Sequence, residues 1–329
     1  MTSLIHRRGL LAGAACLLAP SLAPSSARAA WRPSHPVTIV VPYPAGGGTD
    51  VLARLLAREL ATMLEGSVVV ENAPGASGAV GSRRVARAEP DGHTLLVTTN
   101  QTHATNLSLL KGGGGYDPVK DFTVLGGLAD LQHLLVVRKG LEAGSVKDLI
   151  ARAGKEPKLT CASTGIGSAS HLTMELFQVK TGVDFVHVPY RGAAPLLQDM
   201  VGGRIDLAFA TVPTVLGQVQ AGELRALAVA SPSPSPQVPG VPTLAQEGVA
   251  GVEADAWIAA FAPAGLPADI RARYVEAIGA ILARPETKAA IDTQGMLPNW
   301  REPEAFAAFQ KEDIRRWAEI IKAARVSIE

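Results

Sequence analysis

The strongest constraint on the fold of this chain is a continuous β-branched run that is followed by three glycines and then by an amphipathic helix. Residues 37–41, VTIVV, are all β-branched and predict a buried strand. Leucines recur at helical spacing over residues 50–64, which predicts a helix with one apolar face. Gly46, Gly47 and Gly48 separate the two, and Thr49 or Asp50 is the predicted N-cap. A strand that turns through glycines onto a helix is the repeating unit of a parallel sheet.

The same alternation continues along the chain and predicts an α/β protein with two similar units. Further strands are predicted at residues 68–70, within 91–100, and at 134–137, 159–162, 185–188, 205–209 and 224–230. Helices are predicted near residues 81–88 and at 146–153, 168–182, 194–203, 268–283 and 303–326. The Pro- and Ser-rich residues 231–242 predict a surface connection. We therefore expect two lobes, residues 30–130 with 250–329 and residues 131–249, with a ligand site at the carboxyl ends of the strands.

The first 29 residues have the pattern of an export signal and are predicted to be removed. Arg7 and Arg8 precede an apolar run at residues 9–22, and Ala27-Arg28-Ala29 fits the cleavage rule. The paired arginines favour the twin-arginine route, although a general secretory signal fits almost as well. A membrane anchor is disfavoured because no later stretch approaches about 20 apolar residues, and the residues before Cys16 do not fit a lipidation site. We expect a periplasmic protein.

The composition argues against several classes of partner. The 31 basic and 30 acidic residues nearly balance, so no net charge favours nucleic acid or an anionic membrane. Cys161 is the only cysteine after the signal, which excludes an internal disulfide and predicts a small buried thiol. The seven histidines are scattered without an H-x-x-x-H pair, so neither a metal site nor a cofactor is predicted.

Residues 43–50 form the first candidate site, at the turn between the first predicted strand and its helix. Glycines let a ligand approach the backbone. The free amides of a helix's first turn, together with the helix dipole, attract an anion without any Lys or Arg. A tight turn without a ligand is the alternative interpretation. A phosphate loop is disfavoured because no Gly-Lys-Ser/Thr closes the motif.

Residues 161–177, CASTGIGSASHLTMELF, again place hydroxyls and glycines between a predicted strand and a helix. Hydroxyls and amides together form a cradle for a carboxylate. The Gly165-Ile166-Gly167 segment matches a dinucleotide fingerprint only weakly, because Ser170 stands where a third Gly or Ala is needed. Ser163 or Ser168 with His171 suggests a serine hydrolase as an alternative. That reading is disfavoured because no G-x-S-x-G motif occurs and serines at helix starts are usually caps.

Two further predicted strand ends carry polar side chains. Tyr190 and Arg191 end one of them, and Arg191 either pairs with a distal carboxylate of a ligand or is an ordinary surface arginine. Asn100, Gln101 and Thr102 follow the end of another, where they either hydrogen-bond to a ligand or cap the next helix.

These stretches, in this order, resemble the Bug family, the periplasmic solute receptors of tripartite tricarboxylate transporters. The similarity covers nearly the whole chain after the signal and runs through VPYPAGGGTDVLARLLA, VVENAPGASGAVGSRRVARAEPDGHTLL, YDPVKDF, ASTGIGSASHLTMELFQVKTGVDFVHVPYRGAAPLLQDMVGGRIDLAFA, LRALAVAS, VPTLAQEG and FAPAGLP. The resemblance implies a two-lobed α/β periplasmic-binding-protein fold of the Venus-flytrap, type II-like class. It also implies a small organic anion in the cleft and a membrane permease as partner. One departure is Phe209-Ala210-Thr211, where the family often has FDN, so a cleft aspartate that would suit an amino-acid ligand is missing.

The resemblance implies further that the loops at residues 43–50 and 163–171 grip one ligand carboxylate, largely through main-chain amides and ordered waters. The predicted ligand-binding residues are Tyr43, Ala45, Gly46, Gly47, Gly48, Thr49, Asp50, Thr99, Asn100, Gln101, Ser163, Thr164, Gly167, Ser168, His171, Tyr190 and Arg191. The predicted protein is a monomeric, non-enzymatic receptor for a mono-, di- or tricarboxylate that does not bind nucleic acid. A ligand-loaded sensor for a signalling receptor and, less favoured, an exported serine hydrolase are the alternatives.

Overall fold

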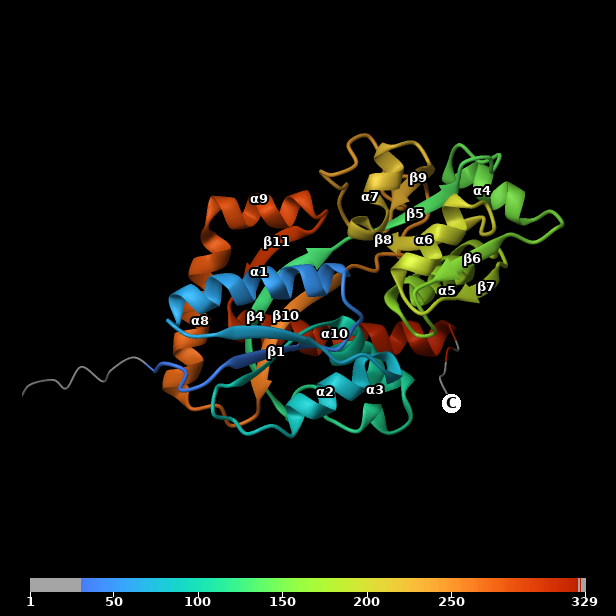
Figure 1. Cartoon of the computed structure of the whole chain (residues 1–329). Coiled ribbons are helices and arrows are strands. Elements are labelled where there is room, and N and C mark those ends of the chain that lie inside the picture. Colours follow the sequence, from blue (N-terminus) through green and yellow to red (C-terminus); the bar gives the residue numbers. More distant parts are fainter. Residues whose placement is uncertain (1–30, 325, 327–329) are drawn as a thin grey trace, which may run out of the picture. The chain divides into compact units, whose positions relative to one another are not determined.

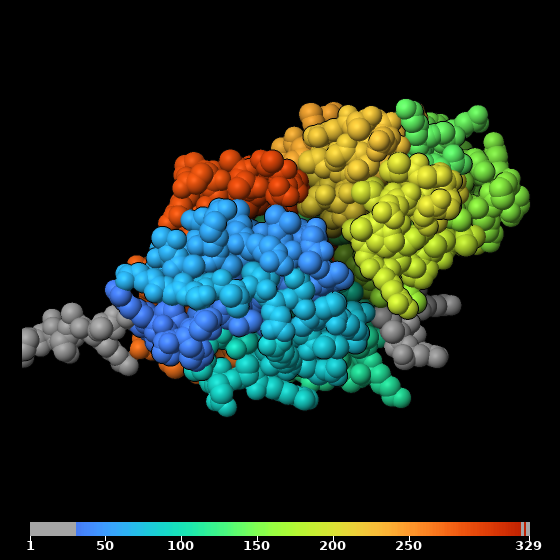
Figure 2. All heavy atoms as spheres, viewed as in Figure 1, coloured from blue at the N-terminus to red at the C-terminus, as the bar shows by residue number. Residues whose placement is uncertain are grey.

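The strands of the described residues form two sheets, and in each sheet the strand order departs from the order in the chain. Figure 1 shows the helices and strands as ribbons, and Figure 2 shows the heavy atoms in the same view. The computed structural model describes residues 31–324 and 326, so the predicted export signal lies outside the described residues. The first sheet has the order β11-β4-β10-β3-β1-β2 and the second the order β7-β6-β8-β5-β9. The strands are β1 (Val37–Val41), β2 (Val68–Asn72), β3 (Thr94–Thr99), β4 (Phe122–Leu131), β5 (His133–Arg138), β6 (Thr160–Ser163), β7 (Val186–Pro189), β8 (Leu207–Thr211), β9 (Leu224–Val229), β10 (Ala256–Pro263) and β11 (Leu297–Arg301).

Helices follow most of the strands and confirm the α/β class. They are α1 (Gly48–Met63), α2 (Ala79–Ala86), α3 (Asn106–Leu109), α4 (Val146–Ala153), α5 (Ala169–Thr181), α6 (Ala193–Val201), α7 (Val212–Gln220), α8 (Ala268–Ala283), α9 (Pro285–Thr293) and α10 (Pro303–Ala324). Short 3₁₀ turns lie at Ala76–Gly78 and Lys111–Gly114, and a π-helical turn lies at Gln101–Thr105. Within the described part of the chain, no helix combines the length and the apolar character that crossing a membrane requires.

Both faces of the first sheet are covered by helices. Successive side chains of a strand point to opposite faces. Val37, Ile39 and Val41 pack into the cluster that contains the leucines of α1 and the isoleucines of α8. Val40 packs on the other face, in the cluster that contains Trp257 and the aromatic side chains of α10. Residues 37–41 are therefore apolar apart from Thr38, because both faces of their strand are covered.

Parallel pairing brings the glycine turns next to other strand ends. β1 pairs in parallel with β2 and β3, so the turn after Val41 lies beside the carboxyl ends of both neighbours. In the second sheet β6 pairs in parallel with β7 and β8, which places the turn after Ser163 at the same edge as the ends of those strands. Both candidate turns thus lie where ligand sites occur in α/β sheets.

The chain passes between the two sheets twice among the described residues. Gln132 alone separates β4 of the first sheet from β5 of the second, and residues 230–255 connect β9 back to β10. The division into two lobes that close on a ligand stays a prediction.

Several predicted boundaries are wrong for identifiable reasons. The helix predicted to start at residue 50 begins at Gly48 with Gly47 as its N-cap, because the Asp50 carboxylate bonds back to the turn instead of capping the helix. Strand β4 was not predicted, since its Gly126-Gly127 pair breaks the apolar pattern. A side chain at Gly126 would collide with the Trp300 ring, so close packing explains this glycine. The prediction that Cys161 is a free, buried thiol is confirmed.

Candidate functional site

A buried carboxylate holds the first glycine turn in place. The amide of Gly46, a residue with φ of +89°, donates to Asp50 Oδ2 at 2.9 Å. Arg54 Nε donates to the same oxygen at 3.0 Å, and Asn72 Nδ2 donates to Oδ1 at 3.0 Å. Burial acts to raise the pKa of the Asp50 carboxyl, but the hydrogen bonds from Arg54, the Gly46 amide and Asn72 outweigh it and lower that pKa. Asp50 is therefore a charged anchor for the turn, with its charge offset by Arg54.

Tyr43 joins this turn to the polar end of β3. Asn72 Nδ2 also donates to the Tyr43 carbonyl at 3.0 Å, which fixes the start of the turn. The Tyr43 hydroxyl lies 2.7 Å from Thr99 Oγ1 and 3.2 Å from Thr98 Oγ1, and Thr98 Oγ1 lies 2.6 Å from Thr102 Oγ1. Tyr43 and Thr99, predicted from separate stretches, are thus one hydrogen-bonded unit. Burial raises the pKa of the Tyr43 hydroxyl, so it stays neutral at physiological pH.

The first amides of α1 are left without acceptors. Val51 is the first residue of the helix to make a backbone bond to the turn, donating to Gly47 O at 3.0 Å. The amides of Gly48, Thr49 and Asp50 precede it and find no acceptor among the described residues, as expected for the first turn of a helix. Gly47 is exposed and Gly48 half-buried, as is usual for a turn that a ligand approaches. Of the other predicted residues here, Ala45 is exposed and Thr49 is buried.

The second glycine turn repeats this construction with a histidine in place of the aspartate. Gly167, with φ of +74°, donates its amide to Nδ1 of His171 at 3.0 Å. The spacing of four residues is the same as between Gly46 and Asp50. Because Nδ1 accepts this hydrogen bond, the proton of the neutral ring lies on Nε2, which faces Glu175 Oε1 at 3.4 Å. Ser168 is the N-cap of α5, and its Oγ accepts from the His171 amide at 3.3 Å.

The hydroxyls of the second turn are engaged within the turn. Ser163 Oγ donates to the Gly165 carbonyl at 3.1 Å and lies 2.7 Å from His187 Nε2, which is then the donor of that pair. Ser168 Oγ donates to the Gly165 carbonyl at 2.7 Å. His187 stacks on His171 with ring centroids 4.0 Å apart, and burial together with this neighbour lowers the pKa of His187 to about 4. The histidine that meets Ser163 is therefore His187, not the predicted His171.

Thr164 and Tyr190 border the same turn. Thr164 donates its amide to Ser170 Oγ at 3.0 Å and is half-buried. The Tyr190 hydroxyl donates to Asp199 Oδ2 of α6 at 2.6 Å, and burial together with this carboxylate raises the pKa of Tyr190 to about 12. The neighbouring Arg191 is exposed and has no ion-pair partner within the described ranges. Its guanidinium is available to a ligand, whereas the Tyr190 hydroxyl is already occupied.

Asn100 and Gln101 lie at the start of the π-helical turn that follows β3. The Asn100 side chain is 1% exposed, and its Nδ2 has no hydrogen-bond partner among the described residues. A buried amide donor without a partner is costly, and such groups mark places where a water or ligand is needed. Gln101 is half-buried, and its amide donates to Thr99 Oγ1 at 3.3 Å. π-Turns of this kind are frequent at functional sites.

The predicted site residues thus form two separate groups. Tyr43, Asp50 and Thr99 are joined through hydrogen bonds in the first sheet, and Ser163, Ser168 and His171 in the second. No hydrogen bond or ion pair links one turn to the other in the part of the chain that the structure describes. The N-terminal residue of α1 instead faces α7 and the residue before β11: a Cβ at Gly48 would lie 3.8 Å from Pro213 and 3.6 Å from Met296 Sδ.

Sequence reasoning missed two side chains that organise these turns. Asn72 ends β2 and pairs in register with Val41, the last residue of β1. His187 lies on β7 and pairs in register with Cys161 of β6. In both cases the signal is a polar side chain near the end of a strand parallel to the one that carries the glycine turn. Neighbouring parallel strands end at the same edge, so such a residue is a candidate for this position.

The role of His171 gives a first testable prediction. Replacing His171 by leucine leaves the Gly167 amide without an acceptor, which we expect to cost about 1–3 kcal/mol of unfolding free energy. Replacing it by asparagine places Oδ1 where Nδ1 lies and should recover most of this loss. Urea unfolding of the three proteins measures the difference. Equal stability of the leucine and asparagine variants would contradict the assigned hydrogen bond.

Comparisons with known proteins identify the family to which this α/β scaffold belongs. The family profile described as "Tripartite tricarboxylate transporter family receptor" matches residues 52–326. The protein BugT of Bordetella pertussis is 33% identical over 324 residues, with 98% of this chain and 97% of BugT covered. The chain therefore belongs to the tripartite tricarboxylate transporter receptor family.

Solved structures support the same fold. R. palustris Rpa4515, solved with adipate, superposes with a TM-score of 0.85 at 36% identity, covering 90% of this chain and 99% of that protein. MatC from Rhodopseudomonas palustris, solved with bound malate, gives a TM-score of 0.81 at 32% identity, covering 88% and 99%. The predicted fold class, an α/β periplasmic-binding-protein fold of the Bug type, is confirmed.

Proposed function

We propose that the protein is a periplasmic receptor that captures a small organic carboxylate and delivers it to the permease of a tripartite transporter. The observation that carries this proposal is the shared construction of the two turns. In each turn, a side chain of the following helix accepts a hydrogen bond from a glycine amide. The acceptor is Asp50 in the first turn and His171 in the second. The helix-start amides of α1 remain free to stabilise an anion.

The electrostatics of the first turn suit an anionic ligand despite the nearby Asp50. The Asp50 carboxylate accepts hydrogen bonds from Arg54, Asn72 and the Gly46 amide, so its negative charge is compensated within the turn. A ligand carboxylate therefore meets backbone amides instead of a bare negative charge. Binding both helix starts with one carboxylate favours a closed form over an open one, because only closure makes both sets of contacts.

The described side chains favour acids without an amino group. Ala210 is the penultimate residue of β8 and is 1% exposed, at the position where the resemblance to the Bug family leads us to expect an aspartate. An α-ammonium group would find no carboxylate from that position. Arg191, exposed and unpaired among the described residues, is the candidate partner for a second ligand carboxylate. The adipate and malate bound by the two structural relatives belong to the class of small dicarboxylates that we propose here.

A ligand screen tests this proposal. We expect adipate, malate or a related acid to raise the melting temperature of the purified protein, since a ligand at a hundred times its Kd adds about 2.7 kcal/mol to folding stability. Native mass spectrometry would then show a one-to-one complex. Stabilisation by glutamate but by no acid lacking an amino group would contradict the proposed ligand class. Capture of a permease from membranes only in the presence of ligand would favour transport, and capture of a receptor kinase would favour the sensor.

We also propose that the protein has no hydrolase activity. The Ser163 hydroxyl donates to a backbone carbonyl, and the Ser163 side chain is fully buried. We expect no turnover of ester or amide substrates by the purified protein. Turnover that is lost in Ser163→Ala and kept in Ser233→Ala, a change in the connection after β9, would establish the hydrolase instead.

A further inference from the structure

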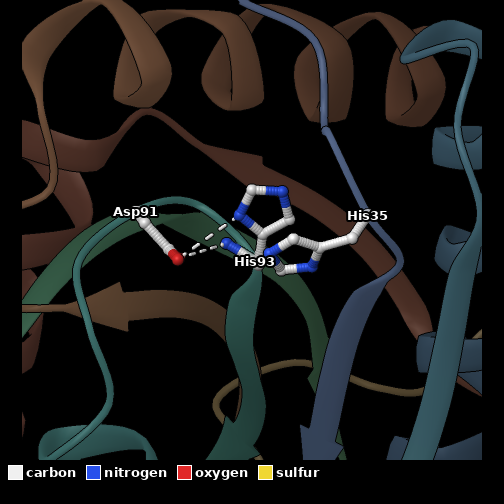
Figure 3. Close-up of side chains that lie close together, drawn as sticks. All are labelled: His35, Asp91 and His93. Carbon is white, nitrogen blue, oxygen red and sulfur yellow. Dashed lines mark hydrogen bonds and ion pairs between the residues drawn. The ribbon is translucent and has the colours of Figure 1, made fainter.

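Three potential metal ligands meet at the opposite end of the first sheet from the glycine turn. His35 lies just before β1, and Asp91 and His93 lie just before β3 (Figure 3). Each offers one ligand atom, and these atoms all lie within 4.8 Å of one another. Throughout residues 31–324 and 326, no other group of three His, Cys, Asp or Glu side chains meets in this way. The backbone fixes this neighbourhood, since Thr38 of β1 donates its amide to His93 O at 2.8 Å.

His93 provides a buried ring nitrogen that makes no hydrogen bond and has only a long contact with a carboxylate. The side chain is 9% exposed, and Nδ1 makes no hydrogen bond with any described residue. This nitrogen faces Asp91 Oδ1 at 3.4 Å, an ion-pair contact that Figure 3 marks with a dashed line. The second dashed line from Asp91 is the hydrogen bond that the His93 backbone amide donates to the same oxygen at 2.9 Å. The other ring nitrogen, Nε2, accepts from the Ser34 amide at 3.2 Å and lies 3.4 Å from Ser34 Oγ. A buried polar atom without a partner costs free energy that a bound ion would recover.

The surroundings of the exposed His35 ring suit a metal ligand. Its Nδ1 lies 3.4 Å from the Pro36 carbonyl, a contact that suits the tautomer with the proton on Nδ1 and the lone pair of Nε2 free. A metal-binding histidine usually donates its second ring N–H to a carbonyl or carboxylate in this way. The His35 ring is exposed and stacks on His93 with centroids 3.6 Å apart.

We propose that His35, Asp91 and His93 bind one divalent transition-metal ion of the zinc class, with water completing the coordination. Two imidazole nitrogens and one carboxylate oxygen form a ligand set that suits zinc. Ligand bonds of about 2.0–2.2 Å require the atoms to draw closer than they are here. The exposed His35 ring leaves the stack and Asp91 closes in, while the buried His93 stays in place. The ion takes His93 Nδ1, and the ring proton moves to Nε2. The Ser34 amide then gives up its hydrogen bond to Nε2, and the new Nε2–H donates to Ser34 Oγ instead.

Such an ion would link the segment before β1 to the turn before β3, because it would bind side chains from both. Both histidines and Asp91 lie at the amino ends of these strands, whereas the candidate carboxylate site follows the carboxyl end of β1. The metal would therefore stabilise the fold without occupying the proposed ligand site. The sequence shows no spacing motif for it, because 58 positions separate His35 and His93, and only the parallel pairing of β1 with β3 brings them together.

Titration calorimetry with zinc chloride tests the site, using protein without a polyhistidine tag in a buffer free of chelators. We expect one equivalent of zinc to bind and to raise the melting temperature. His35→Ala and Asp91→Asn should each weaken zinc binding about tenfold or more. Both side chains are exposed, so these variants should fold even if His93 variants do not.

The matched control is Asp184→Asn, which removes an exposed carboxylate elsewhere in the chain that pairs with Lys158. We expect zinc affinity in this variant to equal that of the unchanged protein. Absence of saturable zinc binding would overturn the proposal. So would zinc binding that persists at full affinity in the His35→Ala, Asp91→Asn double variant.

Discussion

Replacing Gly48 by tryptophan should abolish the thermal shift that a carboxylate ligand produces. Gly48 is the first residue of α1, and its half-exposed position lies beside the free amides of the helix start. A Cβ there would already lie 3.6 Å from Met296 and 3.8 Å from Pro213, so an indole at this position fills the space in front of the amides. The backbone conformation of Gly48 is helical and needs no glycine, so we expect the variant to fold.

Gly217→Trp is the matched control for this change. Gly217 is an exposed glycine inside α7, and a Cβ there would meet nothing within 4 Å. With a ligand at a hundred times its Kd, the unchanged protein and the control should both gain about 2.7 kcal/mol, while Gly48→Trp should gain none. If Gly48→Trp keeps the full shift, the first glycine turn does not bind the ligand, and the proposed site is wrong.

The local parts of both candidate turns were predictable from sequence because each is built from neighbours in the chain. The strand at residues 37–41, the helix after the glycines and the end of α5 at Gly182 follow from hydrophobic spacing and from turn chemistry. Gly182 adopts φ of +73° as the residue that ends α5, which agrees with the predicted helix end. Local pattern is a reliable guide to such features.

The parts that were missed depend on contacts between residues distant in the sequence. Strand β10 pairs antiparallel with β3 and β4, and β11 pairs antiparallel with β4. The glycines of β4 break its apolar pattern in the sequence, and the reason for Gly126 is the packing of Trp300 against it. The N-cap of α1 was misassigned because Asp50 bonds to Gly46, Arg54 and Asn72, and the last of these comes from another strand. Similarly, spacing alone could not pair Ser163 with His187, since that contact depends on the register of β6 with β7.

Neutralising Asp50 should cost more stability than removing any exposed carboxylate of the chain. Asp50→Asn keeps the shape of the side chain but places an amide group against the donors that now surround both carboxylate oxygens. Hydrogen bonds to a charged acceptor contribute about 1.5–3 kcal/mol, so we expect a loss of about 2 kcal/mol in unfolding free energy. The exposed pair of Asp184 with Lys158 provides the control, because such pairs contribute about 0–1 kcal/mol. The turn is held by Asp50, so the variant should also bind its ligand more weakly.

The lowered pKa of Asp50 also predicts how the stability of the folded protein depends on pH. The folded protein lowers the pKa of Asp50 below the value of about 3.9 expected in an unfolded chain. The unfolded state therefore takes up the proton first as the pH falls. The contribution of Asp50 to stability is fully present above about pH 5 and is lost as the pH falls below 4, through the folded pKa. Urea unfolding of the unchanged protein and of Asp50→Asn should give a difference of about 2 kcal/mol at pH 7 that shrinks as the solution is acidified below pH 4. A difference that stays constant down to pH 3 would show that the anchor acts through its shape and not through its charge.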